Sequence, residues 1–109
     1  MDWEAKWQKL TPAQRLWLEV FGLQGLPDLD QRKVLSIVDS LPAREARVVR
    51  LKYGFEGTSS TLKEIGKKLI RADTGEIGVS KEIARLELKK ALHRLKHPRR
   101  RKEWEEAKL

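Results

Sequence analysis

The sequence predicts an all-α protein of about five or six helices. Along most of the chain, apolar residues recur at the three- and four-residue spacing of a helix face, and the connections between these stretches are short. Helix-capping residues precede several stretches and glycine follows some of them. A length of 109 residues, with 39% hydrophobic and 37% charged residues, fits one soluble, helix-rich domain.

Residues 1–38 are expected to form an N-terminal helical extension packed on the same domain. Trp3 and Trp7 share a helical face with Leu10 and predict a short first helix, whose tryptophans are expected in the core rather than at an oligomer interface. A second helix is predicted by a capping box, a proline in its first turn and a final glycine, at Thr11, Gln14, Pro12 and Gly22. Its apolar stripe is Leu16, Trp17, Val20 and Phe21.

Two further helices follow this extension and its turn. Asp28 or Asp30 caps the third helix, and Pro42 opens the fourth, which spans 43–53 and stops at Gly54. The third helix is expected to bury Val34, Leu35, Ile37, Val38 and Leu41. The fourth is expected to bury Ala46, Val49 and either Leu51 or Tyr53.

The last two predicted helices lie in tandem. A capping box at Thr61 and Glu64 begins a short helix that ends at Leu69, and Ser80 begins a long helix that ends at Lys96. The apolar stripe of the long helix is Ala84, Leu88, Ala91, Leu92 and Leu95. Two consecutive helices, the second strongly basic, are typical of a helix-turn-helix, which places its second helix in the major groove of DNA.

The segment between these two helices, residues 70–78, predicts a small β-hairpin inserted in the turn. Small or β-branched residues flank Asp73-Thr74-Gly75 on both sides. Asp-Thr-Gly is also the catalytic signature of aspartic proteases, but those enzymes need two facing aspartates in a β-rich body. A single copy in a helical chain therefore indicates a turn.

Composition and spacing argue against several other classes of protein. Without cysteine there is no disulfide or thiolate metal site, and no apolar run approaches the roughly 20 residues of a membrane span. A cytoplasmic protein that does not enter membranes is therefore expected. His93 and His97 lie four residues apart, but Arg94 and Lys96 repel a cation and a third local ligand is missing. No catalytic arrangement stands out, so no enzymatic activity, metal or other cofactor is expected.

The net charge of +8 is concentrated near the C-terminal end. Residues 79–102 contain ten of the 24 Lys and Arg residues and only two acids, Glu82 and Glu87. A basic block of this kind fits the phosphates of a nucleic acid, whereas the alternative is a solvated helix face.

Residues 39–100 resemble region 4, the C-terminal promoter-binding region, of housekeeping-type bacterial sigma factors. The stretches that carry the resemblance are, in order, LPAREARVVRLKYGFEG, TLKEIGKKL and GVSKEIARLELKKALHRLKHPRR. The resemblance implies a helix-turn-helix over residues 39–109. It also implies binding to the minus-35 element of double-stranded promoter DNA and to the flap of the RNA polymerase β subunit.

Matched position by position, the resemblance implies a set of DNA contacts. Positions where the family touches the DNA backbone are occupied by Arg44, Lys52, Thr61 and Lys63, although the family has an acid in place of Lys63. The base-reading end of the recognition helix is occupied by Ser80, Lys81, Glu82 and Arg85. Later phosphate-facing positions are occupied by Lys90 and Lys96, for which simple solubility is the alternative.

The chain departs from the family's pattern in three respects. Roughly eight extra residues separate the two tandem helices, where the family has a tight turn. No core-binding or promoter-melting region is recognised before residue 39, so a stand-alone sigma-like protein is expected. Without gaps in the alignment, Ile83 and Leu86 replace a family arginine and glutamine.

The positions of Ile83 and Leu86 allow two interpretations. With the helix starting at Ser80, both lie away from the apolar stripe, where they read bases differently or contact a partner protein. An alkyl group meets a thymine methyl but cannot form the bidentate hydrogen bonds that identify guanine or adenine. A gapped alignment shifts the helix start by one residue and places both side chains in the core.

The sequence therefore predicts a non-enzymatic, DNA-binding transcription regulator that binds promoter DNA and RNA polymerase. The alternative, from a different class, is a protein-interaction module that mimics region 4. Such a module occupies the polymerase flap or a sigma partner without reading DNA.

Overall fold

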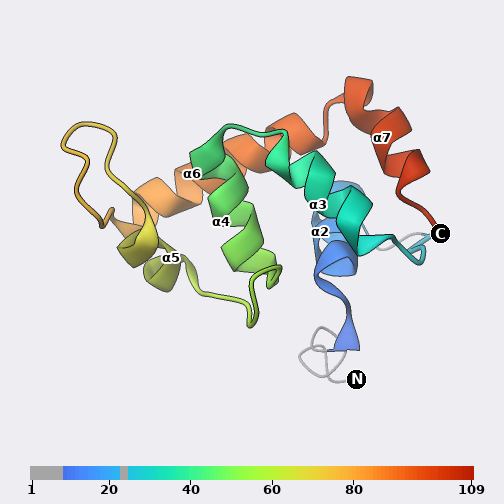
Figure 1. Cartoon of the computed structure of the whole chain (residues 1–109), viewed down its shortest axis with the longest axis horizontal. Helices are drawn as coiled ribbons and strands as arrows, with labels where there is room; N and C mark the ends of the chain where they lie inside the picture. Colours follow the sequence, from blue (N-terminus) through green and yellow to red (C-terminus); the bar gives the residue numbers. More distant parts are fainter. Residues whose placement is uncertain (1–8, 23–24) are drawn as a thin grey trace.

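The computed structural model describes residues 9–22 and 25–109, and Figure 1 shows how their helices are arranged. Six α-helices lie within these ranges, and a 3-10 turn, η1 (Pro98–Arg100), precedes the last. The helices are α2 (Pro12–Phe21), α3 (Gln31–Asp39), α4 (Ala43–Tyr53), α5 (Leu62–Lys68), α6 (Lys81–Leu95) and α7 (Arg101–Glu106). The predicted all-α class is confirmed. The helix expected around Trp3 and Trp7 falls on residues outside the described ranges.

Side-chain capping hydrogen bonds confirm the predicted starts of α2, α3, α5 and α6, whereas α4 begins after Pro42 without one. Thr11 and Gln14 form a capping box at α2, as Thr61 and Glu64 do at α5. Asp30, rather than Asp28, caps α3, because its carboxylate accepts the first free backbone amides of that helix. None of the described helices has the length and apolar character that a membrane crossing needs.

The main hydrophobic core joins helices from both ends of the chain. It consists of Ala13, Leu16, Trp17, Val34, Ile37, Val38, Leu41, Ala46, Val49, Tyr53, Ala91, Leu95, Trp104 and Ala107. Helices α2 and α3 thus share one core with α4 and α6. Of the apolar residues predicted for α3, Leu35 is only half-buried.

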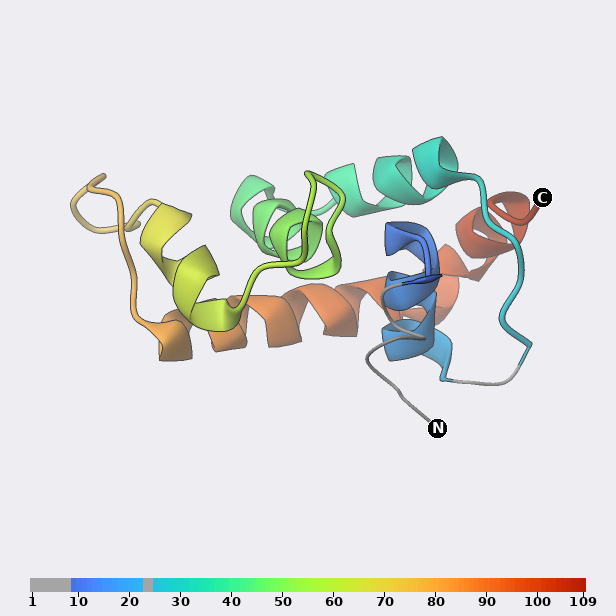
Figure 2. The same ribbon diagram turned by 90° about the horizontal axis from the view of Figure 1, so that it is seen from below.

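A second core lies between α4, α5 and the first half of α6. It consists of Val48, Leu51, Ile65, Leu69 and Ala84. Both candidates at the end of α4 are buried, because Tyr53 enters the main core while Leu51 enters the second. Half-buried Leu88 packs against both cores. Helix α6 therefore contributes residues to both cores, and Figure 2 shows this helix from below.

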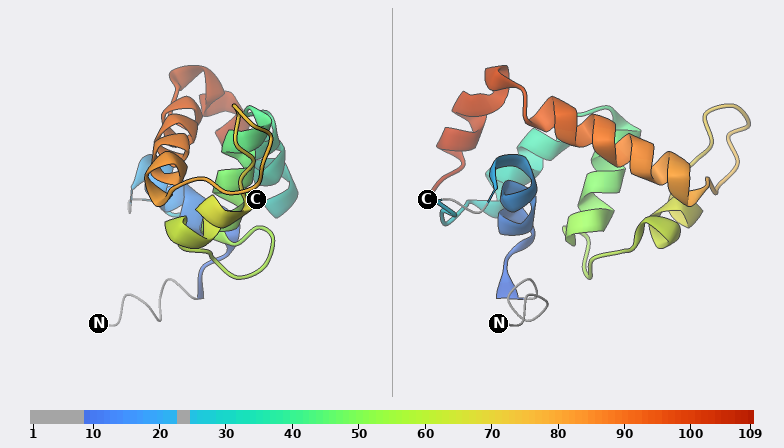
Figure 3. Two further views of the ribbon diagram at one scale, coloured as in Figure 1. Left: turned by 90° about the vertical axis from the view of Figure 1, so that its left-hand side faces the viewer. Right: turned by 180° about the vertical axis from the view of Figure 1, so that it is seen from behind.

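A C-terminal helix that the sequence did not predict completes the main core. After α6 the chain turns sharply through η1 into α7, which is seen from behind in Figure 3. Trp104 of α7 is 1% exposed, and its indole N–H donates to the Leu95 carbonyl at 3.1 Å. Its ring meets those of Trp17 and Phe21 edge-on, with centroids 5.8 and 5.4 Å away.

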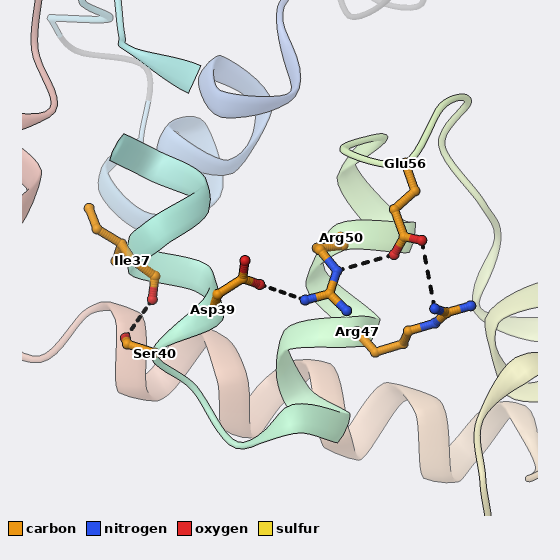
Figure 4. Close-up of polar contacts among 6 residues, drawn as sticks. All are labelled: Ile37, Asp39, Ser40, Arg47, Arg50 and Glu56. Carbon is orange, nitrogen blue, oxygen red and sulfur yellow. Dashed lines mark hydrogen bonds and ion pairs between the residues drawn. The ribbon is translucent and has the colours of Figure 1, made fainter. Parts of the chain in front are cut away.

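Ion pairs tie α4 to its neighbours on the solvent side (Figure 4). The guanidinium of Arg50 lies 2.5 Å from a carboxylate oxygen of Asp39 on α3 and 3.1 Å from Glu56. Glu56 also lies 3.6 Å from Arg47. The Arg50–Asp39 pair thus links α4 to α3, while both Glu56 pairs link α4 to the turn after it. At the end of α3 the hydroxyl of Ser40 donates to the Ile37 carbonyl at 2.6 Å.

The predicted β-hairpin between α5 and α6 is not supported. Residues 70–78 form a projecting loop (Figure 1) with one isolated antiparallel bridge, Ile70 to Ile77, and no strand. The amide of Arg71 donates to the Glu76 carbonyl at 2.7 Å, and that of Gly78 to the Leu69 carbonyl at 2.7 Å. Both isoleucines are exposed, so the loop has no apolar face to pack and its pairing does not extend into a ladder.

Candidate nucleic-acid interface

Helices α5 and α6 meet at one point of close backbone contact. The Val79 amide donates to the carbonyl of Gly66 at 2.7 Å, so the chain entering α6 lies directly against α5. Glycine is required here, because a Cβ on Gly66 would lie 2.6 Å from the Val79 carbonyl oxygen. This contact sets the angle at which the second helix leaves the first.

The first two turns of α6 expose the residues that were expected to read bases. The Ser80 hydroxyl accepts the Ile83 amide at 3.2 Å and caps the helix, which leaves Lys81, Glu82 and Arg85 exposed. The Nε of Arg85 lies 3.1 and 3.2 Å from the carboxylate oxygens of Glu82. These hydrogen bonds lower the pKa of Glu82 and raise that of Arg85. In the unbound protein Glu82 therefore holds the Arg85 guanidinium.

Ile83 and Leu86 are exposed, at 40% and 44% of their surface. The buried residues of α6 are instead Ala84, Ala91 and Leu95. The interpretation in which α6 begins after Ser80 and the two aliphatic side chains face outward is confirmed, and the gapped alignment that buries them is wrong. The partner of these side chains stays a prediction.

A second group of predicted residues meets where α4 faces α6. Glu87 of α6 lies 3.8 Å from Arg44 of α4 and 3.4 Å from Lys90. Arg44 also lines a hollow of about 580 Å³ together with Ser80, Ile83 and residues of the 70–78 loop. The structure thus brings Arg44, Lys90 and the start of α6 onto adjoining surface.

The other residues predicted to touch the DNA backbone do not line this hollow. Lys52 is half-buried in the last turn of α4, and Lys63 is exposed on α5. The Thr61 hydroxyl accepts the Glu64 amide at 3.2 Å, so its oxygen already serves as a helix cap. Lys96 ends α6 and lines a different surface. DNA contact by these four residues stays a prediction.

That surface is an open basic groove which the sequence did not predict. It has a volume of about 1430 Å³ and runs from the outer side of α6 to α7, beside the connection of α3 to α4. Its cationic lining residues are Lys89, Lys90, Arg94, Lys96, Arg99, Arg100 and Lys102. The run of basic residues after His97 was the sequence signal for this groove. The position of that run beside α6, however, depends on α7.

Two contacts shape this basic groove. Arg94 is held 3.0 Å from the carboxylate of Glu45, which is only 5% exposed. Arg100 donates to the Ser40 hydroxyl at 2.7 Å. Arg94 thus links the second half of α6 to α4, and Arg100 links η1 to the α3–α4 connection.

Both histidines line the basic groove, and His97 also caps a turn. Nδ1 of His97 accepts the amide of Arg99 at 3.2 Å, so this side chain caps η1. Among residues 9–22 and 25–109, no group of three His, Asp or Glu side chains is arranged to hold a metal ion.

The packed pair α5–α6, with the exposed and basic start of α6, defines a helix-turn-helix. Residues 37–97 match the family described as sigma-70, region 4, and the chain belongs to that family. The match begins two residues before the stretch in which the motifs were recognised and ends at the His97-Pro98 junction.

Two curated relatives are RNA polymerase sigma factors named SigA. The chain is 37% identical over 73 residues to that of Clostridium acetobutylicum and 34% identical over 96 residues to that of a Bacillus species. These matches cover 66% and 87% of the chain but only 17% and 21% of the relatives. The chain thus spans about a fifth of their length, and both matches include residues outside 37–97. No solved structure gives a significant match to the chain.

Proposed function

We propose that the chain is a transcription regulator that binds promoter DNA through α6 and contacts RNA polymerase through the β-subunit flap. The observation that carries the proposal is the start of α6 in the helix-turn-helix. There Ser80 caps the helix, and Lys81, Glu82 and Arg85 are exposed where such helices meet base edges. Membership of the sigma-70 region 4 family supports the same assignment.

The charges around α6 suit a polyanion. Lys81, Lys89 and Lys96 form no ion pair with another described residue and are exposed. Their free ammonium groups would displace counterions from DNA phosphates, which is the main source of sequence-independent affinity. Arg44 and Lys90, which share Glu87, would add phosphate contacts on one side of the helix.

The experiment is binding of a fluorescent DNA duplex at a series of salt concentrations. We expect log K against log salt to have a slope of about −4 to −7. Changing Lys90 and Lys96 together to alanine should weaken binding to all sequences alike, whereas Arg85→Ala should change the preference between sequences. A flat salt dependence, or no binding at low salt, removes the DNA-binding function.

The second candidate is a protein-interaction module that mimics region 4 without reading DNA. It is favoured by the exposed Ile83 and Leu86, since neither side chain can form hydrogen bonds with base edges. Pull-down of the isolated polymerase β-subunit flap tests it. Capture of the flap by a chain that fails to bind DNA would select this candidate over the first.

A further inference from the structure

Leu86 is an aliphatic side chain in unusual surroundings. It is the sixth residue of α6, is 44% exposed, and lies away from the buried residues Ala84, Ala91 and Leu95. One turn away on either side, its neighbours on the helix surface are Glu82, Ile83, Lys89 and Lys90, all of them exposed. Leu86 thus presents an apolar tip next to Ile83, with charged side chains on the other three positions.

These surroundings do not suit the centre of a protein–protein interface. Such centres are depleted of charged residues, and Lys and Glu are the residue types most strongly excluded from them. Around Leu86 the lysines of the basic groove would have to be desolvated together with it. A partner that offers phosphates to the lysines and a small apolar group to the leucine fits better.

The major groove of DNA offers this combination. Phosphates line its edges, and the thymine 5-methyl is the apolar group that base pairs present there. A recognition helix lies along the groove with its N-terminal residues towards the bases, and Leu86 lies in the second turn of α6.

Building on the DNA-binding function proposed above, we propose that Leu86 reads a thymine methyl group in the major groove. Contact with one methyl group excludes water from roughly one CH₂ equivalent of apolar surface in total, which corresponds to about a threefold to fivefold change in affinity. The proposal makes Leu86 a specificity-determining residue, and it assigns a T·A base pair opposite the second turn of α6.

Ile83 is the natural comparison for Leu86. It is exposed to a similar degree, at 40%, but it lines the hollow beside Arg44 and the 70–78 loop. Leu86 instead lines the basic groove. The two side chains are neighbours on the surface of α6 but border different hollows, and the methyl contact is assigned to Leu86.

The test uses uracil, which is thymine without its 5-methyl group. A duplex is first selected from a random-sequence pool by the wild-type chain, and each thymine is then replaced singly by deoxyuridine. We expect one replacement to weaken binding about threefold to fivefold and the others to change it less than twofold. In Leu86→Ala that loss should fall below twofold, because the side chain that met the methyl is gone, while Ile83→Ala should retain it.

Several results overturn the inference. Salt-dependent DNA binding with no thymine sensitive to methyl removal would show that Leu86 reads nothing, although the proposed function stands. An unchanged uracil penalty in Leu86→Ala, or one abolished only in Ile83→Ala, would assign the methyl contact to another residue. A chain that binds no duplex at any salt concentration overturns the proposed function and this inference together.

Discussion

Gly66 and Val79 are in direct backbone contact at the centre of the helix-turn-helix. The Val79 amide donates to the Gly66 carbonyl at 2.7 Å, and the Val79 carbonyl oxygen lies 2.6 Å from where a Cβ on Gly66 would be. The obstructing atom belongs to the backbone, so no flexible side chain can move aside to make room for a Cβ. The relative position of α5 and α6 thus depends on the absence of a side chain at residue 66.

Gly66→Ala is therefore expected to destabilise the protein. In an unobstructed helix the change would raise the free energy of unfolding by about 0.5–1 kcal/mol. Here we expect it to fall by about 1–3 kcal/mol, because α5 must move away from the start of α6. Urea unfolding followed by circular dichroism measures the difference. Lys67→Ala, at the exposed next position, is the control and should change stability little; a stabilised Gly66→Ala would contradict the contact.

Trp104→Ala should lower the free energy of unfolding by about 3–5 kcal/mol. The indole is buried against Trp17, and its N–H is satisfied by the Leu95 carbonyl, so truncation leaves both a cavity and an unpaired acceptor. Trp104→Phe keeps most of the ring and should cost less. Chemical denaturation of the three proteins gives the order. Equal stability of Trp104→Ala and wild type would mean that α7 does not contribute to the core.

The 70–78 loop should be dispensable for folding. We expect replacement of residues 71–76 by Asn-Gly, which suits a two-residue turn between the bridged Ile70 and Ile77, to change the free energy of unfolding by less than about 1 kcal/mol. The reason is that both isoleucines are exposed and the backbone hydrogen bonds of Arg71, Gly75 and Gly78 lie within the loop or at its base. Far-UV circular dichroism and thermal unfolding measure the outcome. Loss of helical signal would show that the loop supports the α5–α6 pair.

Removing Arg85 should raise the pKa of Glu82. Hydrogen bonds from Arg85 hold this pKa below its ordinary value, and Lys81 adds a smaller effect. In Arg85→Ala we expect the pKa to return towards the ordinary value of about 4.3, as followed by carbon NMR of the side-chain carboxyl. Lys89→Ala is the control. An unchanged Glu82 in Arg85→Ala would show that the pair does not form in solution.

The same pair sets the sign of a pH effect on stability. Because the pKa of Glu82 is lower in the folded than in the unfolded protein, its contribution is present above the ordinary glutamate pKa. That contribution is lost as the pH falls through the lowered value of the folded state. In Arg85→Ala this part of the acid dependence should shrink, which stability measurements between pH 7 and about pH 3 would detect.

Most helix boundaries could be predicted because their signals are local. Thr11 and Thr61 each form a capping box with the residue three positions later, and Gly54 ends α4 in the left-handed conformation. Helix α7 could not be predicted in this way. Trp104, its buried residue, and Ala107, which follows the helix, lie in a run of charges, and both are buried in the main core with residues of α2 and α3, which are far away in the sequence. The hairpin was overpredicted because β-branched residues at 70 and 77 have no partner surface.

The contacts of the candidate site likewise divide into those that local sequence spacing predicts and those that depend on distant parts of the chain. The Glu82–Arg85 pair follows from a spacing of three residues on a helix, and the outward position of Leu86 follows from helical periodicity. The link from Arg44 through Glu87 to Lys90 depends on how α4 crosses α6, and the basic groove depends on α7. No local pattern carries that information.

Leu86 and Leu88 should respond in opposite ways to the same substitution. Leu86→Gln is expected to leave the free energy of unfolding within about 0.5 kcal/mol of wild type, because 44% of the side chain already faces solvent. Leu88→Gln, two residues along α6, should cost about 2 kcal/mol or more, because that side chain packs against both cores and its amide would lack partners. Urea unfolding of both variants gives the comparison on one helix.

Glutamine can also pair with adenine, so Leu86→Gln should shift the bases preferred in a random-sequence selection without loss of fold. If Leu86→Gln proved as destabilising as Leu88→Gln, α6 would be rotated in solution from the orientation described above, and Arg85 would lose its proposed base-reading position.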